Sequence, residues 1–147
     1  AGCLEAYCSI PALEAAAARR LPEAPEHSFL RKRAAAERRT AADRIAFPLI
    51  LEALRRGDPL AETLLAEAAV AFGIGLANML NMLHPQKVIL GGPLVAAHDL
   101  FFRTATEVAL KNTYYYPRYK AVFSKGVLGE DAVATGAALM VARLLTE

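Results

Sequence analysis

The fold of this chain is decided by one short stretch, QKVILGGPL, which occupies Gln86–Leu94. Within it, Lys87–Leu90 is rich in β-branched and apolar residues and ends at a Gly-Gly-Pro turn, which predicts a buried strand. Downstream, Leu94–Lys111 predicts a helix, and Ala121–Phe123, followed by Gly126, predicts a second strand. Strand, helix and strand form a βαβ unit, so we expect two parallel strands joined by a right-handed crossover.

A long apolar segment precedes this unit and predicts a central helix that runs to Leu83. Asp58 is a favourable N-cap and Pro59 suits the first helical position. The segment is apolar on most faces, which indicates burial between layers. Gly73 and Gly75 each lower helix propensity by about 1 kcal/mol relative to alanine. We therefore expect another part of the chain to pack closely against them.

The other helices are predicted by caps and prolines. Leu4–Leu21 reads as helix with a break and restart at Ser9, and a loop follows at 22–28. Thr40 and Asp43 resemble a capping box, so a helix is expected to begin there, with Pro48 kinking or bounding it. The last helix is expected over 132–145.

The composition excludes several classes of protein. The 147 residues suit one domain, and 55% are hydrophobic, which is enough for a core. The net charge of +2 is too small to indicate nucleic acid or a membrane surface. We expect no apolar run to reach the roughly 18 residues that span a bilayer. Cys3 and Cys8 would close too short a loop for a useful disulfide, so we expect a reducing cytoplasm.

The strand-end pair Gly91 and Gly92 is the first candidate site. Ligands of open α/β sheets bind beyond the carboxyl ends of the strands, where glycine lets the backbone approach a phosphate, ribose or base. A plain turn that needs positive φ is the alternative, and this segment by itself favours it. The sequence contains no Walker A loop, no GxSxG motif and no metal-binding carboxylate cluster, so no catalytic residue is assigned.

Cys3 and Glu5 are the second candidates. A thiolate at Cys3 suits zinc, although no CxxC partner or paired histidine accompanies it, and a free thiol is the simpler reading. The Glu5 carboxylate suits a polar ligand, although a glutamate on a helix is most often solvated.

For three further groups of residues we favour a structural role over a functional one. Asn78 and Asn81 share a helix face and are expected to bond neighbouring backbone. The tyrosines at 114–116, with Tyr119, suit loop or interface packing better than stacking on nucleic acid. The basic residues from Arg31 to Arg39 suit a solvated helix surface better than phosphate binding.

Four segments together carry a family resemblance: GCLEAY at 2–7, GDPLAETLLAEAAVAFGIGLANMLNMLHP at 57–85, QKVILGGPL at 86–94 and GEDAVATGAALM at 129–140. In this order they resemble the carboxyl-terminal part of the ROK family (repressor, open reading frame, kinase). This family contains bacterial sugar kinases and sugar-responsive transcriptional repressors. The resemblance implies the carboxyl-terminal lobe of an actin-like, ribonuclease H-like two-lobed ATPase fold, helix-rich and of the α/β class.

The resemblance also implies roles for individual residues. Cys3 matches the last cysteine of the family's zinc motif, Glu5 matches a glutamate that contacts sugar hydroxyls, and Gly91 and Gly92 match glycines beside the adenosine of ATP. The chain is expected to be one domain, 1–147, of a larger protein. Residues 1–30 would hold the end of the zinc and sugar motif, and residues 40–147 the helices and the βαβ lobe. The other zinc ligands, the phosphate-binding turn and the catalytic aspartate are expected upstream.

Two functions follow from the resemblance. In the family's kinases a third glycine usually follows the pair matched by Gly91 and Gly92, whereas Pro93 stands here, a feature that favours the repressor branch. The first expectation is therefore a sugar-binding and oligomerisation lobe of a cytoplasmic regulator, catalytically inactive alone, that reaches DNA only through a separate amino-terminal domain. The alternative is half of a glucokinase-like kinase that uses ATP and magnesium. A plain oligomerisation module is a third reading. Either full protein would carry zinc and form a homo-oligomer, with no membrane partner.

Overall fold

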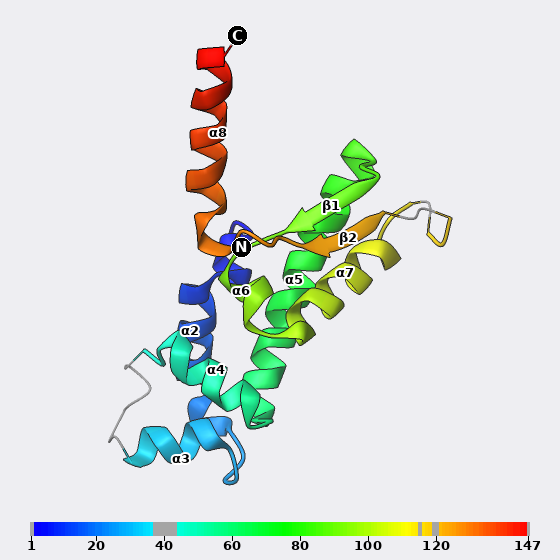
Figure 1. Cartoon of the computed structure of the whole chain (residues 1–147). Helices are drawn as coiled ribbons and strands as arrows, with labels where there is room; N and C mark the ends of the chain where they lie inside the picture. Colours follow the sequence, from blue (N-terminus) through cyan, green and yellow to red (C-terminus); the bar gives the residue numbers. More distant parts are fainter. Residues whose placement is uncertain (1, 37–43, 115, 119–120, 147) are drawn as a thin grey trace.

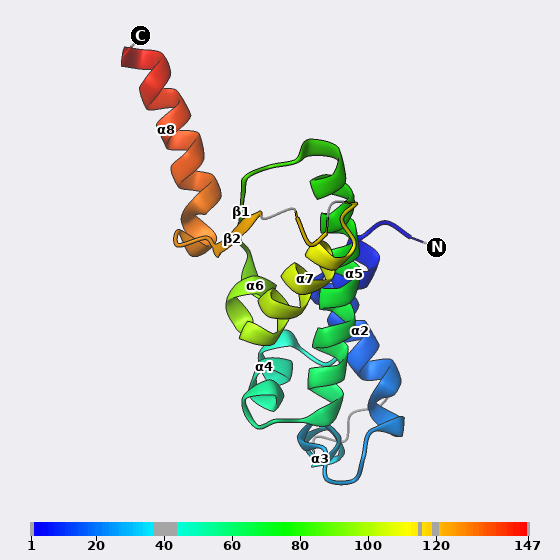
Figure 2. The same cartoon turned by 90° about the vertical axis from the view of Figure 1, so that its right-hand side faces the viewer.

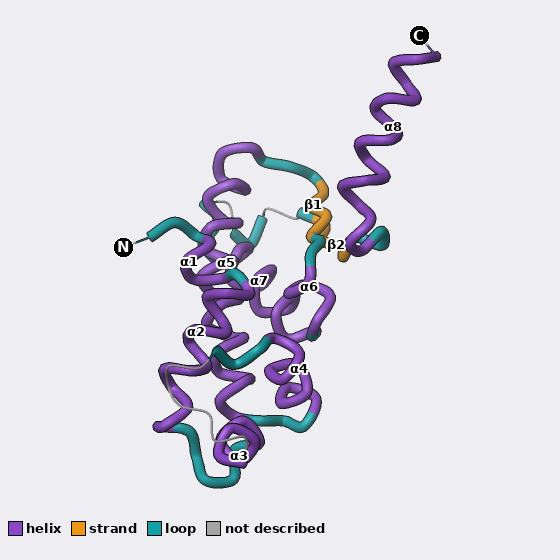
Figure 3. The backbone as a smooth tube through the Cα atoms, turned by 90° about the vertical axis from the view of Figure 1, so that its left-hand side faces the viewer, coloured by secondary structure: helices purple, strands orange, loops and turns teal. Residues whose placement is uncertain are grey.

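The computed structural model of the chain describes residues 2–36, 44–114, 116–118 and 121–146 (Figure 1). It is a helix-rich α/β structure whose strands, β1 (Lys87–Leu90) and β2 (Val122–Lys125), form one parallel pair. Leu90 lies opposite Lys125 in the register, so the carboxyl ends of both strands meet at one edge. Figure 3 shows the two strands together at one side of the helical body. The predicted α/β class and parallel pairing are confirmed.

The centre of the molecule is α5 (Pro59–Leu83), whose first turn is capped as expected. The Asp58 carboxylate accepts a hydrogen bond from the Ala61 amide at 3.0 Å. Helix α7 (Asp99–Lys111) packs along α5 (Figure 2). The close packing predicted at the helix glycines is confirmed. A Cβ at Gly73 would lie 2.7 Å from the Ala105 carbonyl oxygen of α7, and one at Gly75 would lie 2.7 Å from the Leu4 side chain.

Short helices precede α5 in the chain. They are α1 (Glu5–Cys8), α2 (Ile10–Arg20), η1 (Leu21–Glu23), α3 (Phe29–Ala36) and α4 (Phe47–Arg55). The predicted break is confirmed, because the Ser9 hydroxyl accepts a hydrogen bond from the Ala12 amide at 3.2 Å and caps α2. A helix was expected to begin at Thr40, and this predicted start is wrong. Residues 44–46 are not helical and α4 begins at Phe47, so Pro48 marks a boundary. Thr40 and Asp43 lie outside the described residues.

The crossover between the strands contains two helices, α6 (Pro93–Ala97) and α7, so the single helix expected over 94–111 is wrong. His98 separates them because its backbone is extended, with φ −157° and ψ 138°. Its imidazole Nδ1 accepts a hydrogen bond from the Leu100 amide at 3.2 Å and caps α7. Strand β2 also lies slightly later than predicted, at Val122–Lys125 in place of 121–123.

One face of the sheet is uncovered, so the expectation of a buried strand is wrong for that face. Leu90 is buried and Val88 packs against the core, but Ile89 is 63% exposed and Val122 is 60% exposed. The last helix, α8 (Ala132–Thr146), has no buried residue and projects away from the helical body (Figures 1 and 2). Parallel strands are normally covered on both faces, whereas here one face is open to solvent.

Helix α5 also corrects the expectation that no segment is long and apolar enough to span a membrane. By length and composition its 25 residues meet that criterion. Its packing is that of a core helix, because α1, α2, α4 and α7 all contact it. Its buried residues are spread from Leu60 to Leu80 and form part of the main hydrophobic cluster.

Candidate functional site at the strand ends

The turn after β1 has the geometry that its sequence requires. Gly92 has φ 105° and ψ 166°, a conformation that residues with a side chain avoid, and it precedes Pro93 at the first position of α6. The Gly126 amide donates a hydrogen bond of 2.7 Å to the Leu90 carbonyl oxygen, which aligns the ends of both strands. A Cβ at Gly91 or Gly92 would meet no atom within 4 Å, so these glycines leave open space beside the backbone.

That open space is a cavity of about 250 Å³, which we call the strand-end cavity. Its walls come from the ends of both strands, from α6 and from the turn that leads to α8. The lining includes Gly91, Gly92, Gly126, Gly129 and Lys125. Pockets for whole drug-sized ligands start at about 300 Å³, so this cavity suits one part of a ligand, such as a nucleoside. The residues present therefore fit the adenosine group that the resemblance implies.

Two further hollows include residues from the amino-terminal segment in their lining. The turn cavity, about 280 Å³, is also lined by Gly91 and Gly92 and includes Cys8 and Ser9 in its lining. The amino-terminal hollow, about 390 Å³ and more open, also includes Ser9, together with Cys3 and Glu5. The turn cavity shares Gly91 and Gly92 with the strand-end cavity and Ser9 with the amino-terminal hollow, whereas no described residue lines both the strand-end cavity and the amino-terminal hollow.

Glu5 is the first residue of α1, and its side chain is exposed in the amino-terminal hollow. Its backbone is fixed, because its carbonyl oxygen accepts a hydrogen bond from the Ser9 amide at 3.2 Å. Across the described residues no side chain or amide is seen to bind its carboxylate. A carboxylate accepts several hydrogen bonds, so Glu5 is available to a ligand that carries hydroxyl groups.

Cys3 and Cys8 are both free thiols, the first exposed and the second half-buried. Burial raises the pKa of the Cys8 thiol, whose Sγ donates to the Leu4 carbonyl oxygen at 3.2 Å. Zinc requires about four nitrogen, sulfur or oxygen ligands. The described part of the chain holds no group of three or more His, Cys, Asp or Glu side chains that would bind a metal ion. The residues present therefore do not fit a complete zinc site, and Cys3 would supply one ligand at most.

Among the described lining residues of the strand-end cavity, the charged one is Lys125, the last residue of β2. Its Nζ donates a hydrogen bond of 2.6 Å to Asp99 Oδ1 and lies 5.5 Å from the centre of the Phe102 ring. Lys125 holds the pKa of the Asp99 carboxyl below its usual value, first through this hydrogen bond and then through its charge, with help from Arg103 and His98.

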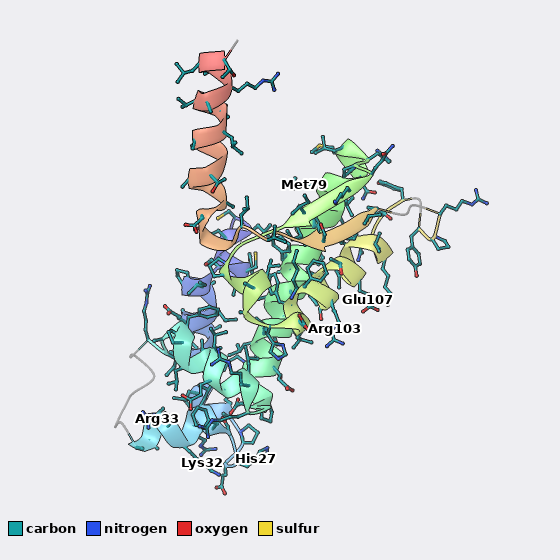
Figure 4. All side chains as sticks on the ribbon, viewed as in Figure 1. His27, Lys32, Arg33, Met79, Arg103 and Glu107 are labelled. Atoms are coloured by element: carbon teal, nitrogen blue, oxygen red, sulfur yellow. The ribbon has the colours of Figure 1, made fainter. Side chains whose placement is uncertain are left out.

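The remaining sequence candidates lie away from these cavities. The Asn81 amide donates to the Asn112 carbonyl oxygen at 3.2 Å and its Oδ1 accepts from the Tyr114 amide at 3.0 Å, which confirms a structural role. Tyr114 and Tyr116 are exposed, whereas Tyr115 and Tyr119 lie outside the described residues. Lys32 and Arg33 lie on α3, at the end of the molecule opposite the strands (Figure 4).

Sequence reasoning missed Lys125 and Gly126 as site residues. A signal for them exists, because Lys125-Gly126 follows the second strand as Gly91-Gly92 follows the first. The carboxyl ends of parallel strands lie at one edge of the sheet, so both turns had to meet there. The Lys125–Asp99 ion pair has no such signal, since the two residues lie 26 positions apart.

The parallel strand pair with glycine turns at its carboxyl edge belongs to a helix-rich α/β lobe that ROK sugar kinases of the actin-like ATPase fold share. The ROK family model matches residues 1–143. The chain therefore belongs to the ROK family, and the resemblance stated from its sequence is confirmed.

Relatives of both branches of the family are similar to this chain. The xylose repressor of Caldicellulosiruptor bescii is 26% identical over 140 residues, which are 95% of this chain and 33% of the repressor. A ROK family glucokinase from Streptomyces griseus, solved in complex with glucose and AMPPNP, is 28% identical with a TM-score of 0.76, over 95% of this chain and 44% of the kinase.

A ROK family transcriptional regulator, a homologue of the E. coli MLC protein, shares the fold with a TM-score of 0.66 at 22% identity, over 84% of this chain and 28% of the regulator. The chain thus spans less than half the length of each of these three relatives.

Proposed function

We propose that this chain is the carboxyl-terminal, sugar-binding lobe of a sugar-responsive transcriptional regulator. The observation that carries the proposal is Pro93. It occupies the first position of α6, directly after Gly92, and lines both the strand-end cavity and the turn cavity. Proline has no N–H to donate to a ligand, and its ring takes up space at a position where the family's kinases usually have glycine. Nucleotide binding would be weakened there while the sugar site is retained.

The sugar would bind in the amino-terminal hollow. Glu5 supplies an exposed carboxylate at the start of α1, and Ser9 lies on the same surface. Carboxylate oxygens accept hydrogen bonds from adjacent sugar hydroxyls, and a site built on such bonds rejects analogues that lack the hydroxyl. The similarity to a xylose repressor makes a pentose or hexose the ligand class to test.

Regulation would follow from sugar binding at a site shared with the rest of the protein. A ligand shifts a conformational equilibrium only when its affinity differs between the two states. A sugar that contacts Glu5 and a second lobe together would favour the closed arrangement. DNA recognition would belong to a separate amino-terminal domain, and a homo-oligomer would set the spacing of two such domains.

The test is sugar binding by the intact protein and by its Glu5→Gln variant, measured by isothermal titration calorimetry with xylose and glucose. Removal of one charge-assisted hydrogen bond is expected to weaken sugar binding about tenfold or more. Glu62→Gln is the matched control, because Glu62 is an exposed glutamate in the first turn of α5, away from the hollow. Equal sugar affinity of the wild type and Glu5→Gln would contradict the proposal.

A second candidate function is half of an ATP-dependent sugar kinase. The strand-end cavity favours it, because its glycine walls suit a nucleoside and the similar Streptomyces griseus protein was solved with AMPPNP. In that case the catalytic base and the phosphate-binding turn would come from another lobe, because phosphoryl transfer depends on positioning and charge stabilisation. ATP-dependent formation of a sugar phosphate by the intact protein would establish this function.

A further inference from the structure

The strand-end cavity has one charged side chain among its described lining residues, that of Lys125. The rest of the described wall is glycine, proline and apolar residues, including Leu90 and Val95. None of the described lining residues is a carboxylate, so within the described wall the Lys125 ammonium is the charged group that meets a ligand. Glycine backbones at Gly91, Gly92 and Gly126 let a ligand approach that group closely.

The ammonium group is held at the side of the cavity by α7. Its Nζ lies 2.6 Å from Asp99 Oδ1, and the Phe102 ring lies beneath it. The Asp99 side chain is 78% exposed and is not part of the cavity wall, whereas the Lys125 side chain is 37% exposed. An exposed ion pair contributes little net stability, so the lysine can exchange this partner for a stronger one.

We propose that Lys125 is the anion-binding side chain of the strand-end cavity, and that it leaves Asp99 to bind the phosphate group of a small phosphate-bearing ligand. The proposal rests on the proposed function only in taking this cavity as a ligand site. A phosphate group offers several charged oxygens to a mobile ammonium donor, and such charge-assisted bonds are stronger than neutral ones. Two sources of this chemistry are possible, a nucleotide and a sugar phosphate.

Lys125 and Asp99 then have opposite effects on ligand affinity. Lys125→Met removes the cation and is expected to weaken binding of the phosphate-bearing ligand about tenfold. Asp99→Asn removes the competing carboxylate and is expected to tighten it about threefold. If the ion pair served stability alone, Lys125→Met and Asp99→Asn would change the ligand affinity in the same direction.

The experiment titrates the intact protein with AMP and with glucose 6-phosphate, and with the neutral counterparts adenosine and glucose, at low ionic strength by calorimetry. We expect at least one phosphate-bearing probe to bind about tenfold more tightly than its neutral counterpart. The probe whose advantage disappears in Lys125→Met identifies the source, nucleotide or sugar phosphate. Lys125→Arg keeps the charge and should retain most of the advantage, which separates loss of charge from loss of folding.

Lys111→Met is the matched control, because Lys111 also forms an ion pair on α7, with Glu107 at 2.5 Å, and Glu107 points away from the body (Figure 4). Lys111→Met should leave the affinities for all four probes unchanged. Three results would overturn the proposal: no binding of either phosphate-bearing probe, no effect of Lys125→Met, or weaker binding in Asp99→Asn. Binding of neutral sugar and its sensitivity to Glu5→Gln test the proposed function separately.

Discussion

Asp58 joins the start of the central helix to the loop before α3. Its carboxylate accepts hydrogen bonds from the Ala61 amide at 3.0 Å, the Ser28 hydroxyl at 2.7 Å and the Leu30 amide at 3.2 Å. The residue is only 2% exposed. Burial by itself raises the pKa of this carboxyl, but the hydrogen bonds together outweigh burial and lower it. The folded state therefore holds Asp58 ionised.

A lowered pKa makes the stabilising effect of Asp58 dependent on pH. The contribution is fully present above the unfolded-state pKa of about 3.9 and is lost as the pH falls through the lower folded-state value. We expect the free energy of unfolding of the wild type to fall below about pH 4. Asp58→Asn should be less stable at neutral pH by about 1–3 kcal/mol and should lose less on acidification.

Urea denaturation across the range from roughly pH 3 to 7 measures this dependence. The control is again Glu62→Gln, since Glu62 is exposed in the same helical turn and should alter stability by only about 0.3–1 kcal/mol. A wild type and Asp58→Asn variant with parallel pH profiles would rule out a role for this carboxylate in acid sensitivity.

Pro93 is the residue that separates the two candidate functions, and its replacement by glycine tests how. Pro93→Gly restores a backbone N–H and removes the ring from the strand-end and turn cavities. We expect the affinity for AMPPNP to rise about fivefold, the equivalent of one hydrogen bond. Pro59→Gly is the control, because Pro59 holds the same position at the start of α5, outside both cavities. If Pro93→Gly left the AMPPNP affinity unchanged, Pro93 would not be the reason for weakened nucleotide binding, and the proposed function would lose its main support.

The roles of residues that act on their near neighbours in the chain could be predicted from the sequence. The hydrogen-bond partners that lie far away in the chain could not. The cap at Asp58 and the turn at Gly91-Gly92 depend on neighbours within a few positions. The bond from Ser28 to Asp58 and the bond from Lys125 to Asp99 connect residues about 30 positions apart, which depends on how the helices pack. No local pattern encodes that packing.

At the scale of elements, the contact between α5 and α7 holds the lobe together. Gly73 of α5 allows this contact, because a Cβ there would lie 2.7 Å from the Ala105 carbonyl oxygen and 2.8 Å from the Val108 Cβ. Gly73→Ala gains helix propensity but must push α7 away, so we expect a net loss of about 1–3 kcal/mol in the free energy of unfolding. Thermal and urea denaturation measure the loss.

Gly136 provides the opposite case on α8, since a Cβ at that position would meet no atom within 4 Å. Gly136→Ala is expected to leave the stability of the core unchanged and to favour α8 by about 1 kcal/mol. If Gly73→Ala were as stable as Gly136→Ala, the close packing of α5 on α7 would not be the reason for glycine at position 73.

The limits of prediction at this scale have physical causes. The starts of α2 and α5 were predicted because Ser9 and Asp58 cap them through their own side chains. The break at His98 was missed because histidine is an uncommon cap and no glycine or proline marks the position. The start of α4 was placed too early, since the capping-box pattern at Thr40 competes with Pro48, which takes the first turn.

At the scale of the whole molecule, the described part of the chain has an uncovered sheet face and a projecting helix. Ile89 and Val122 expose that face, and Leu144 and Leu145 of α8 are 75% and 82% exposed. The fold class followed from the βαβ pattern, but the uncovered face did not, because an apolar strand pattern is the same whether or not a partner covers it. The exposure of Glu5 in the amino-terminal hollow could likewise not be predicted, because a helical glutamate has the same sequence pattern whether or not a partner covers it.

The central claim is that the intact protein binds a sugar as a signal and does not phosphorylate it. The most direct measurement incubates the intact protein with a saturating sugar, ATP and magnesium and determines sugar phosphate over many multiples of the protein concentration. The account predicts sugar binding that Glu5→Gln weakens and no sugar phosphate above the background without protein. Catalytic formation of sugar phosphate that requires both ATP and the intact protein would contradict the claim and assign the chain to a kinase.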